Sequence, residues 1–194
     1  MARTSEDQLL PGEWACLGIL YTAPAHGFAI AARLKPEGDV GRVWSLSRAL
    51  TYRALEQLEL RGYVRAVGQE PGIAGGNRTI LAATRTGRAQ LRKWLATPVA
   101  HPRDLRSELL LKLVIAEFCG IDVSTMLQMQ RQRVVEMCAA LESRVALDQH
   151  DVVAVWRSES TNAALRFLDR LSAEGHRESS PARAARRRAE GRPE

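Results

Sequence analysis

Two arginines and a tyrosine recur among leucines in the stretch SLSRALTYRALEQLELRGYV, residues 45–64. An arginine guanidinium can donate two hydrogen bonds at once, either to the N7 and O6 atoms of guanine or to a phosphate. A tyrosine hydroxyl can bond to a phosphate or a sugar oxygen. The chemistry that these residue types offer is therefore recognition of a nucleic acid, provided that one element holds them together.

A helix would hold these side chains on one side. Ser45 and Ser47 are suited to cap its beginning, and Gly62 is suited to end it as a left-handed residue. We therefore expect a helix over residues 48–61. At about 100° per residue the helix separates into a packing side and an exposed side. The packing side holds Leu50, Ala54, Leu55 and Leu58, and the exposed side holds Ala49, Tyr52, Arg53 and Glu56, with Arg48 at its edge.

Two helices are expected before this one, and a hairpin after it. PGEWACLGILYTA begins with Pro11 in a helix-starting position, and a shorter helix follows in PAHGFAIAARLKPEG. In this second helix His26 is suited to cap and Gly27 to pack closely, and the apolar residues Phe28, Ile30 and Leu34 are expected to face the core. The runs YVRAVGQ and RTILAAT predict two strands. Helices followed by a hairpin are the order of a winged helix-turn-helix, in which the third helix enters the major groove and the hairpin contacts the flanking backbone.

These elements would bring a defined set of residues to DNA. Arg48, near the start of its helix, is the expected reader of guanine. Tyr52 would contact a phosphate or sugar, with a packing role as the alternative, and the arginines could also be solvated charges. The turn of the hairpin lacks arginine, so its candidates follow the turn. The predicted DNA-binding residues are Ser47, Arg48, Ala49, Tyr52, Arg53, Asn77 and Arg78.

Composition limits the class of protein. Of the 194 residues, 45% are hydrophobic and 26% charged, which suits a protein with a packed core. The formal net charge of +6 favours a polyanionic partner, either nucleic acid or an acidic membrane. No apolar run approaches the roughly 18 residues of a membrane span, and the segment MARTSEDQLL is too polar for a signal peptide. We therefore expect a cytoplasmic protein with no membrane partner.

No pattern in the sequence is typical of an enzyme or a metal protein. HExxH, a GxGxxG after a strand and the phosphate-binding GKS or GKT are missing, and no carboxylate pair stands beside a plausible base. The histidines are scattered, and Cys16, Cys119 and Cys138 have no ligand spacing, so we expect buried free thiols. We expect no catalysis, no cofactor and no metal.

The motifs resemble those of the PadR family of transcriptional regulators. LTYRALEQLELRGYV followed by GNRTILAATRTGRAQLRKWL is similar to the family's recognition helix, wing and Thr-x-x-Gly helix start, and LGILYTAPAHGFAI is similar to its first two helices. HPRDLRSELLLKLVIAEF and STNAALRFLDRLSAE resemble the helical C-terminal domain of the longer, virulence-activator-like subfamily. The resemblance implies a repressor that blocks transcription at an operator and is released by a small-molecule effector.

The expected fold is mainly α with a small β-hairpin wing, in three parts. Residues 1–97 form a winged helix-turn-helix DNA-binding domain, residues 98–175 a helical dimerisation domain, and residues 176–194 a basic disordered tail. Apolar residues spaced by fours and threes, with Gln130 among them, predict a seam for another helix. An internal hairpin through Leu165, Leu168 and Leu171 would use some of it. The predicted dimerisation residues are Leu127, Val134, Met137, Leu141 and Val145.

Two functions remain to be compared. The first is a homodimer that binds a palindromic operator in double-stranded DNA, since two recognition helices roughly 34 Å apart match one helical turn. The second is a winged-helix adaptor that binds another protein without specific DNA binding. Trp14, Trp94 and Trp156 could form the walls of an effector cavity at the dimer interface or be ordinary core residues.

Overall fold

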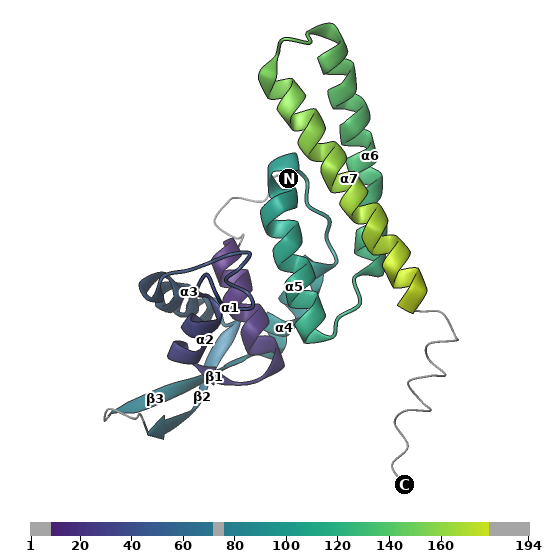
Figure 1. Cartoon of the computed structure of the whole chain (residues 1–194). Helices are drawn as coiled ribbons and strands as arrows, with labels where there is room; N and C mark the ends of the chain where they lie inside the picture. The colour runs from purple at the N-terminus through teal and green to yellow at the C-terminus, as the bar shows by residue number, and fades with distance from the viewer. Residues whose placement is uncertain (1–8, 72–75, 179–194) are drawn as a thin grey trace. The chain divides into compact units, whose positions relative to one another are not determined.

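The computed structural model describes residues 9–71 and 76–178, and Figure 1 shows the whole chain. The protein is mainly helical with one small antiparallel sheet, which confirms the fold class expected from the sequence. It divides into two compact units, one of residues up to 99 with 103–123, and one of residues 100–102 with those from 124 onward. None of the described helices is long and apolar enough to cross a membrane.

The first unit follows the predicted order of three helices and a hairpin. The third predicted helix and both predicted strands are present, with ends within two residues of those expected. The elements are α1 (Pro11–Thr22), β1 (Ala25–His26), α2 (Gly27–Arg33), α3 (Arg48–Leu60), β2 (Val64–Pro71), β3 (Asn77–Ala83), α4 (Arg85–Leu95), a 3₁₀ turn (Pro102–Asp104), a π-helical turn (Leu105–Leu109) and α5 (Leu110–Cys119).

Helix α1 is the centre of the core of the first unit. Pro11 occupies its first position, as predicted, and the Glu13 carboxylate accepts a hydrogen bond of 2.8 Å from the backbone N–H that precedes the helix. Residues 12–20 are all buried, and α1 packs against α3, α4 and α5. A Cβ atom at Gly18 would lie 2.9 Å from Ile115, so this glycine lets α5 approach closely.

A three-stranded sheet has β3 in the middle, in the order β1-β3-β2. Strands β2 and β3 form the predicted hairpin, here called the wing, and residues 72–75 of its turn lie outside the described residues. Strand β1 is absent from the sequence prediction, and its residues pair with Leu81 and Ile80 of β3. Because β1 leads directly into α2, this pairing fixes where α2 begins.

The Thr-x-x-Gly pattern joins the start of α4 to the end of α3. The Thr84 hydroxyl accepts a hydrogen bond from the Gly87 N–H at 3.1 Å and donates to the Gly62 carbonyl at 2.8 Å. A Cβ atom at Gly87 would lie 2.1 Å from the Tyr63 carbonyl oxygen, so the close approach requires glycine. Gly62 has a φ of 69° and follows α3 as predicted, and the Tyr63 N–H then reaches the Leu58 carbonyl at 2.9 Å.

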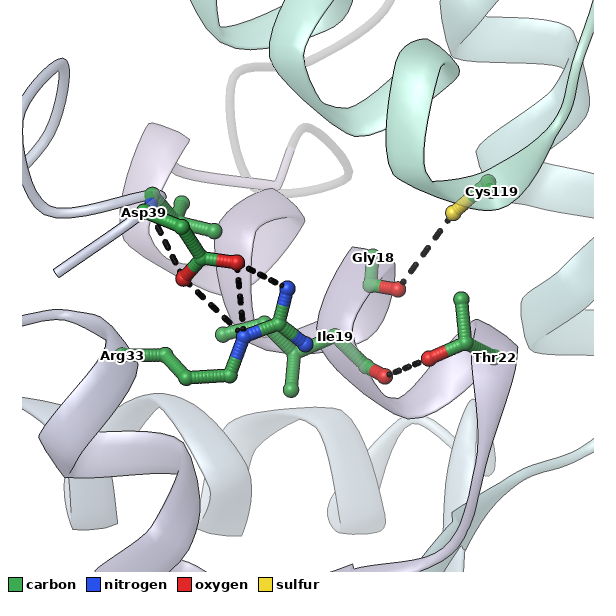
Figure 2. A network of polar contacts seen from close by, with 7 residues as sticks. Gly18, Ile19, Thr22, Arg33, Asp39 and Cys119 are labelled. Carbon is green, nitrogen blue, oxygen red and sulfur yellow. Dashed lines mark hydrogen bonds and ion pairs between the residues drawn. The ribbon is translucent and has the colours of Figure 1, made fainter.

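An ion pair holds the segment between α2 and α3 (Figure 2). The Arg33 Nε donates to both carboxylate oxygens of Asp39, at 3.0 and 3.1 Å, and the Arg33 Cζ lies 4.6 Å from the ring centroid of Phe118. The hydrogen bonds from Arg33 hold the pKa of the Asp39 carboxyl below its ordinary value. In the same view, the Cys119 thiol lies 3.6 Å from the Gly18 carbonyl oxygen and links α5 to α1.

The three cysteines are free thiols, as the sequence predicted. Cys16 and Cys138 are buried, whereas Cys119 at the last position of α5 is only partly buried. Burial raises the pKa of Cys16 to about 12 and that of Cys119 to about 11. All three thiols therefore stay protonated near neutral pH, since burial also raises the pKa of Cys138.

The second unit is a pair of long helices, α6 (Ser124–Leu147) and α7 (Val152–Glu178), which run side by side (Figure 1). An ion pair of 2.6 Å between Arg131 and Asp169 joins them. The internal hairpin that the sequence left as an alternative use of the apolar seam is therefore present. The buried residues are Met126, Gln130, Val134 and Cys138 on α6, and Ala154, Ser158, Thr161 and Leu168 on α7.

The two compact units do not coincide with the predicted boundary at residue 97. Helix α5 falls within the predicted helical domain, but its residues Leu111, Ile115 and Ala116 belong to the core around α1. An apolar helix can join either neighbouring core, and its periodicity does not say which. The predicted basic tail begins inside α7 at residue 176, and residues 179–194 lie outside the described residues.

Candidate nucleic-acid interface

Helix α3 presents a basic and aromatic face to solvent. The Ser47 hydroxyl accepts a hydrogen bond of 3.3 Å from the Leu50 N–H, so Ser47 caps the helix as predicted. The Tyr52 side chain is 44% exposed. The exposed residues of this face are Arg48, Ala49, Tyr52, Arg53 and Glu56.

The packing side of α3 differs from the prediction at one position. Leu50, expected to be buried, is 51% exposed, whereas Thr51 is fully buried. The Thr51 hydroxyl donates to the Ser47 carbonyl at 3.0 Å, so its polar atom is satisfied inside the helix. Positions 51, 54, 55 and 58 follow the helical repeat, while hydropathy alone favoured the leucine over the threonine.

A hollow of about 590 Å³ lies among α2, α3 and the wing. Four of the predicted DNA-binding residues line it: Arg48 and Tyr52 from α3, and Asn77 and Arg78 from β3. The other three predicted residues are exposed on or beside α3 but do not line the hollow. The remaining lining residues are His26, Gly27, Phe28, Leu55, Glu56, Glu59, Thr79 and Leu81.

Phe28 lines the hollow as well, although it is not among the predicted DNA-binding residues. The sequence predicts a packing residue of the second helix at this position, but the Phe28 side chain is 50% exposed. The Cζ atoms of Arg48 and Arg78 lie 5.5 and 5.7 Å from the centroid of its ring. The helical spacing of α2 could have indicated this exposure. The buried positions 27, 30, 31 and 34 lie on one side of the helix, and residue 28 lies off that side.

His26 and Gly27 have the structural roles that the sequence suggested. The His26 Nδ1 accepts the Ala29 N–H at 3.0 Å and caps α2, and its Nε2 lies 3.2 Å from a Glu70 carboxylate oxygen on β2. A Cβ atom at Gly27 would lie 2.8 Å from the Tyr52 ring. The start of α2 is thus fixed against both the wing and α3.

The wing brings two of the predicted residues to the hollow. The Asn77 amide donates to the Gln69 Oε1 at 3.0 Å across the hairpin. Arg78 is half-buried, with its guanidinium near the Phe28 ring. The register of β2 against β3 shifts between residues 66 and 68, as at a β-bulge, a feature that increases the local twist of a hairpin.

The hollow contains both signs of charge. Arg48 and Arg78 face it together with Glu56 and Glu59, so these four side chains have no net charge. Guanidinium groups can donate hydrogen bonds to guanine or phosphate, and a carboxylate can accept a hydrogen bond from the amino group of cytosine. Among the residues that the structure describes, no group of three or more His, Cys, Asp or Glu side chains could hold a metal ion.

Two of the tryptophans considered as effector walls stack on each other in the core. The Trp14 and Trp94 rings are parallel within 9°, with centroids 4.7 Å apart, and both side chains are buried. Beside them, the buried Lys112 pairs with Glu108 at 3.2 Å, and the Trp94 Nε1 donates to Glu108 at 2.9 Å. Burial lowers the pKa of Lys112, and Glu108 opposes that shift. Trp156, on α7 of the second unit, is 70% exposed.

The predicted dimerisation residues lie on α6. Val134 is fully buried inside the hairpin of one chain, so its packing is intramolecular. Leu127, Met137, Leu141 and Val145 are half-buried. Other large apolar side chains of the second unit are exposed: Met129, Leu147, Val152, Val153, Trp156 and Phe167.

Three helices and a wing, with an exposed basic face on the third helix, define a winged helix-turn-helix protein. No family model matches the chain, and no curated protein matches it significantly. Several solved structures are similar to it at low identity. PadR of Bacillus subtilis in complex with operator DNA is 17% identical, with a TM-score of 0.43 over 84% of this chain and 97% of that chain.

The PadR-like transcriptional regulator BC1756 from Bacillus cereus is 18% identical, with a TM-score of 0.37 over 87% of this chain and 99% of that chain. The Vibrio cholerae virulence activator AphA is 20% identical, with a TM-score of 0.38 over 87% and 99%.

Proposed function

We propose that this chain is a transcriptional regulator that binds a specific sequence in double-stranded DNA. One observation supports the proposal most directly: Arg48 and Tyr52 of α3 and Asn77 and Arg78 of the wing line one hollow. In a winged helix, the third helix enters the major groove while the wing follows the neighbouring backbone. The four side chains would then meet the bases and phosphates of a single duplex.

Each residue would have a separate task at the duplex. Arg48 occupies the first position of α3, and residues at that end of a recognition helix contact base edges. It would donate two hydrogen bonds to guanine. Tyr52, one turn later, and Asn77 and Arg78 would bond to phosphate or sugar oxygens, which orient the protein without reading sequence.

The finer proposal is a homodimeric repressor that acts on a palindromic operator in the cytoplasm. The exposed apolar side chains of the second unit support a dimer, because burying them against a second copy would remove them from water. Leu127, Met137, Leu141 and Val145 would lie at or beside that interface. Repression by blocking transcription, and release by a small-molecule effector, follow from the sequence resemblance.

A second candidate function is a protein-binding adaptor that uses the same hollow. The exposed Phe28 and Leu50 and the two glutamates that line the hollow favour it, since a peptide with apolar and basic residues could bind there. Salt separates the two functions. Binding that neutralises phosphates weakens with the logarithm of salt concentration, with a slope of about −0.9 per phosphate, whereas an apolar interface responds little.

The deciding experiment is selection of duplexes from a random-sequence DNA library by the full-length protein. Affinity for the selected duplex and for a scrambled duplex is then measured across a salt series. We expect a preference for the selected duplex and a steep salt slope. No preference, with no salt dependence, would contradict DNA recognition and leave the adaptor.

Arg48→Ala tests the recognition helix directly. If Arg48 reads a base, its loss costs about 1–3 kcal/mol on the selected duplex and less on the scrambled one. Arg133→Ala is the matched control, because Arg133 is an exposed arginine on α6 and its loss removes the same charge. An equal loss of affinity for both duplexes would mean that Arg48 contacts a phosphate and reads no base.

A further inference from the structure

Phe28 is an apolar side chain placed where burial does not explain it. Half of its surface is exposed, while the neighbouring positions Gly27 and Ile30 are buried. Exposure of an aromatic ring to water is unfavourable in free energy, so a contact outside the chain would account for the position of Phe28. Phe28 also lines the hollow that contains the predicted DNA-binding residues.

Two arginines from different elements flank the Phe28 ring. The Arg48 Cζ from α3 lies 5.5 Å from the ring centroid, and the Arg78 Cζ from the wing lies 5.7 Å from it. Arg48 also lies 5.7 Å from the Tyr52 ring. A guanidinium over an aromatic face is attracted by it, so these contacts hold the ring between the two elements proposed to meet DNA.

The backbone of Phe28 has a fixed position relative to α3. The His26 cap and its contact with Glu70 set the start of α2, and the close approach of Gly27 to the Tyr52 ring sets its distance from α3. The ring is therefore preorganised beside Arg48, and its placement needs no movement of α2. Such preorganisation reduces the entropy that a contact costs on binding.

We propose that Phe28 contacts the 5-methyl group of a thymine next to the base read by Arg48, and so contributes to sequence specificity. The inference rests on the proposed function. Of the groups that the major groove displays, the thymine methyl is the apolar one. The other base edges and the phosphates call for hydrogen bonds, which the Phe28 ring cannot make in the conventional way. Loss of one buried methyl corresponds to about a fourfold loss of affinity.

The test removes that methyl from the DNA. In the selected duplex, each thymine is replaced in turn by deoxyuridine, which lacks the methyl and keeps the same base pairing. For the wild-type protein we expect one thymine per half-site at which the change weakens binding about fourfold. For Phe28→Ala, uracil and thymine at that position should bind equally. Phe28→Leu, which keeps an apolar group, should retain part of the difference and serves if the alanine variant fails to fold.

Other results separate this inference from the proposed function. If Phe28 only positions the two arginines, Phe28→Ala weakens binding but leaves every uracil penalty as in the wild type, which overturns the methyl contact. A wild-type scan without any uracil penalty overturns it as well, while Arg48-dependent preference for the selected duplex still supports the regulator. If the protein prefers no duplex, both the proposed function and the contact between Phe28 and thymine are contradicted.

Discussion

At the scale of single residues, the same kind of side chain serves different purposes in different surroundings. Arg48 and Arg78 lie beside an exposed ring at the candidate interface, whereas Arg33 lies over Phe118 and pairs with Asp39. The chemistry of each arginine depends on what else its guanidinium can reach. Arg33 pairs with Asp39 and thereby holds the segment that precedes α3.

The Arg33–Asp39 pair predicts a pH-dependent contribution to stability. The folded pKa of Asp39 is lowered, chiefly by its hydrogen bonds from Arg33. Its contribution is therefore present above the ordinary value of 3.8 and is lost as pH falls through the lowered folded pKa. Wild type should exceed Asp39→Asn in free energy of unfolding at neutral pH, by less than about 1 kcal/mol because the pair is partly exposed.

Urea unfolding between neutral pH and pH 3 would measure this difference, with Glu37→Gln as the control. Glu37 is an exposed carboxylate in the same segment. The gap between wild type and Asp39→Asn should shrink as the solution becomes more acidic. A gap that stayed constant or widened below the ordinary carboxyl range would contradict the assignment.

At the scale of elements, the corner between α3, the wing and α4 depends on one glycine. Helix propensity alone predicts that Gly87→Ala stabilises α4 by about 1 kcal/mol. The Cβ atom would instead lie 2.1 Å from the Tyr63 carbonyl oxygen, so we expect a net loss of about 3 kcal/mol in the free energy of unfolding.

Gly68→Ala is the matched control for that substitution. A Cβ atom at Gly68 would meet no atom within 4 Å, so this variant should stay within about 0.5 kcal/mol of wild type. Chemical denaturation of both variants measures the effect. Similar stabilities for the two would mean that the corner relaxes without cost.

Some of these elements could be predicted from the sequence, and others could not. The ends of α3 were predictable because Ser47 and Gly62 are local signals that act within one turn of the helix. Four of the predicted DNA-binding residues line one hollow, as the predicted helix and wing together would require. Strand β1 was not predictable, because two residues carry no periodicity and their pairing with β3 is set by the tertiary fold. Phe28 and Leu50 were misplaced because hydropathy outweighed helical spacing.

At the scale of the whole molecule, the exposed apolar side chains of the second unit predict self-association. Trp156 is 70% exposed, and Trp156→Ser should leave the α6–α7 hairpin intact. We expect wild type to be a dimer in sedimentation equilibrium and the variant to dissociate at least about tenfold more readily, because a buried tryptophan contributes strongly to interfaces. Glu159→Ser, one turn along α7, should have little effect.

Two results would contradict this prediction in different ways. A wild-type protein that remains a single chain at all concentrations would remove the dimer from the proposed function. A Trp156→Ser variant that associates as wild type does would place the dimer interface on another surface. Neither result would bear on Arg48 as a base reader within one chain.

The placement of α5 has a consequence for how such chains can be rearranged in evolution. Leu111 and Ile115 fill the core around α1, and the helix ends at the left-handed Gly120. A recombination event that joined residues 1–97 to a foreign partner would leave an unfilled apolar face on α1. A crossover just after Val123 would exchange the α6–α7 hairpin and keep the residues of the first unit that follow α5. The boundary between Val123 and Ser124 is therefore the position at which a different helical unit could replace the hairpin.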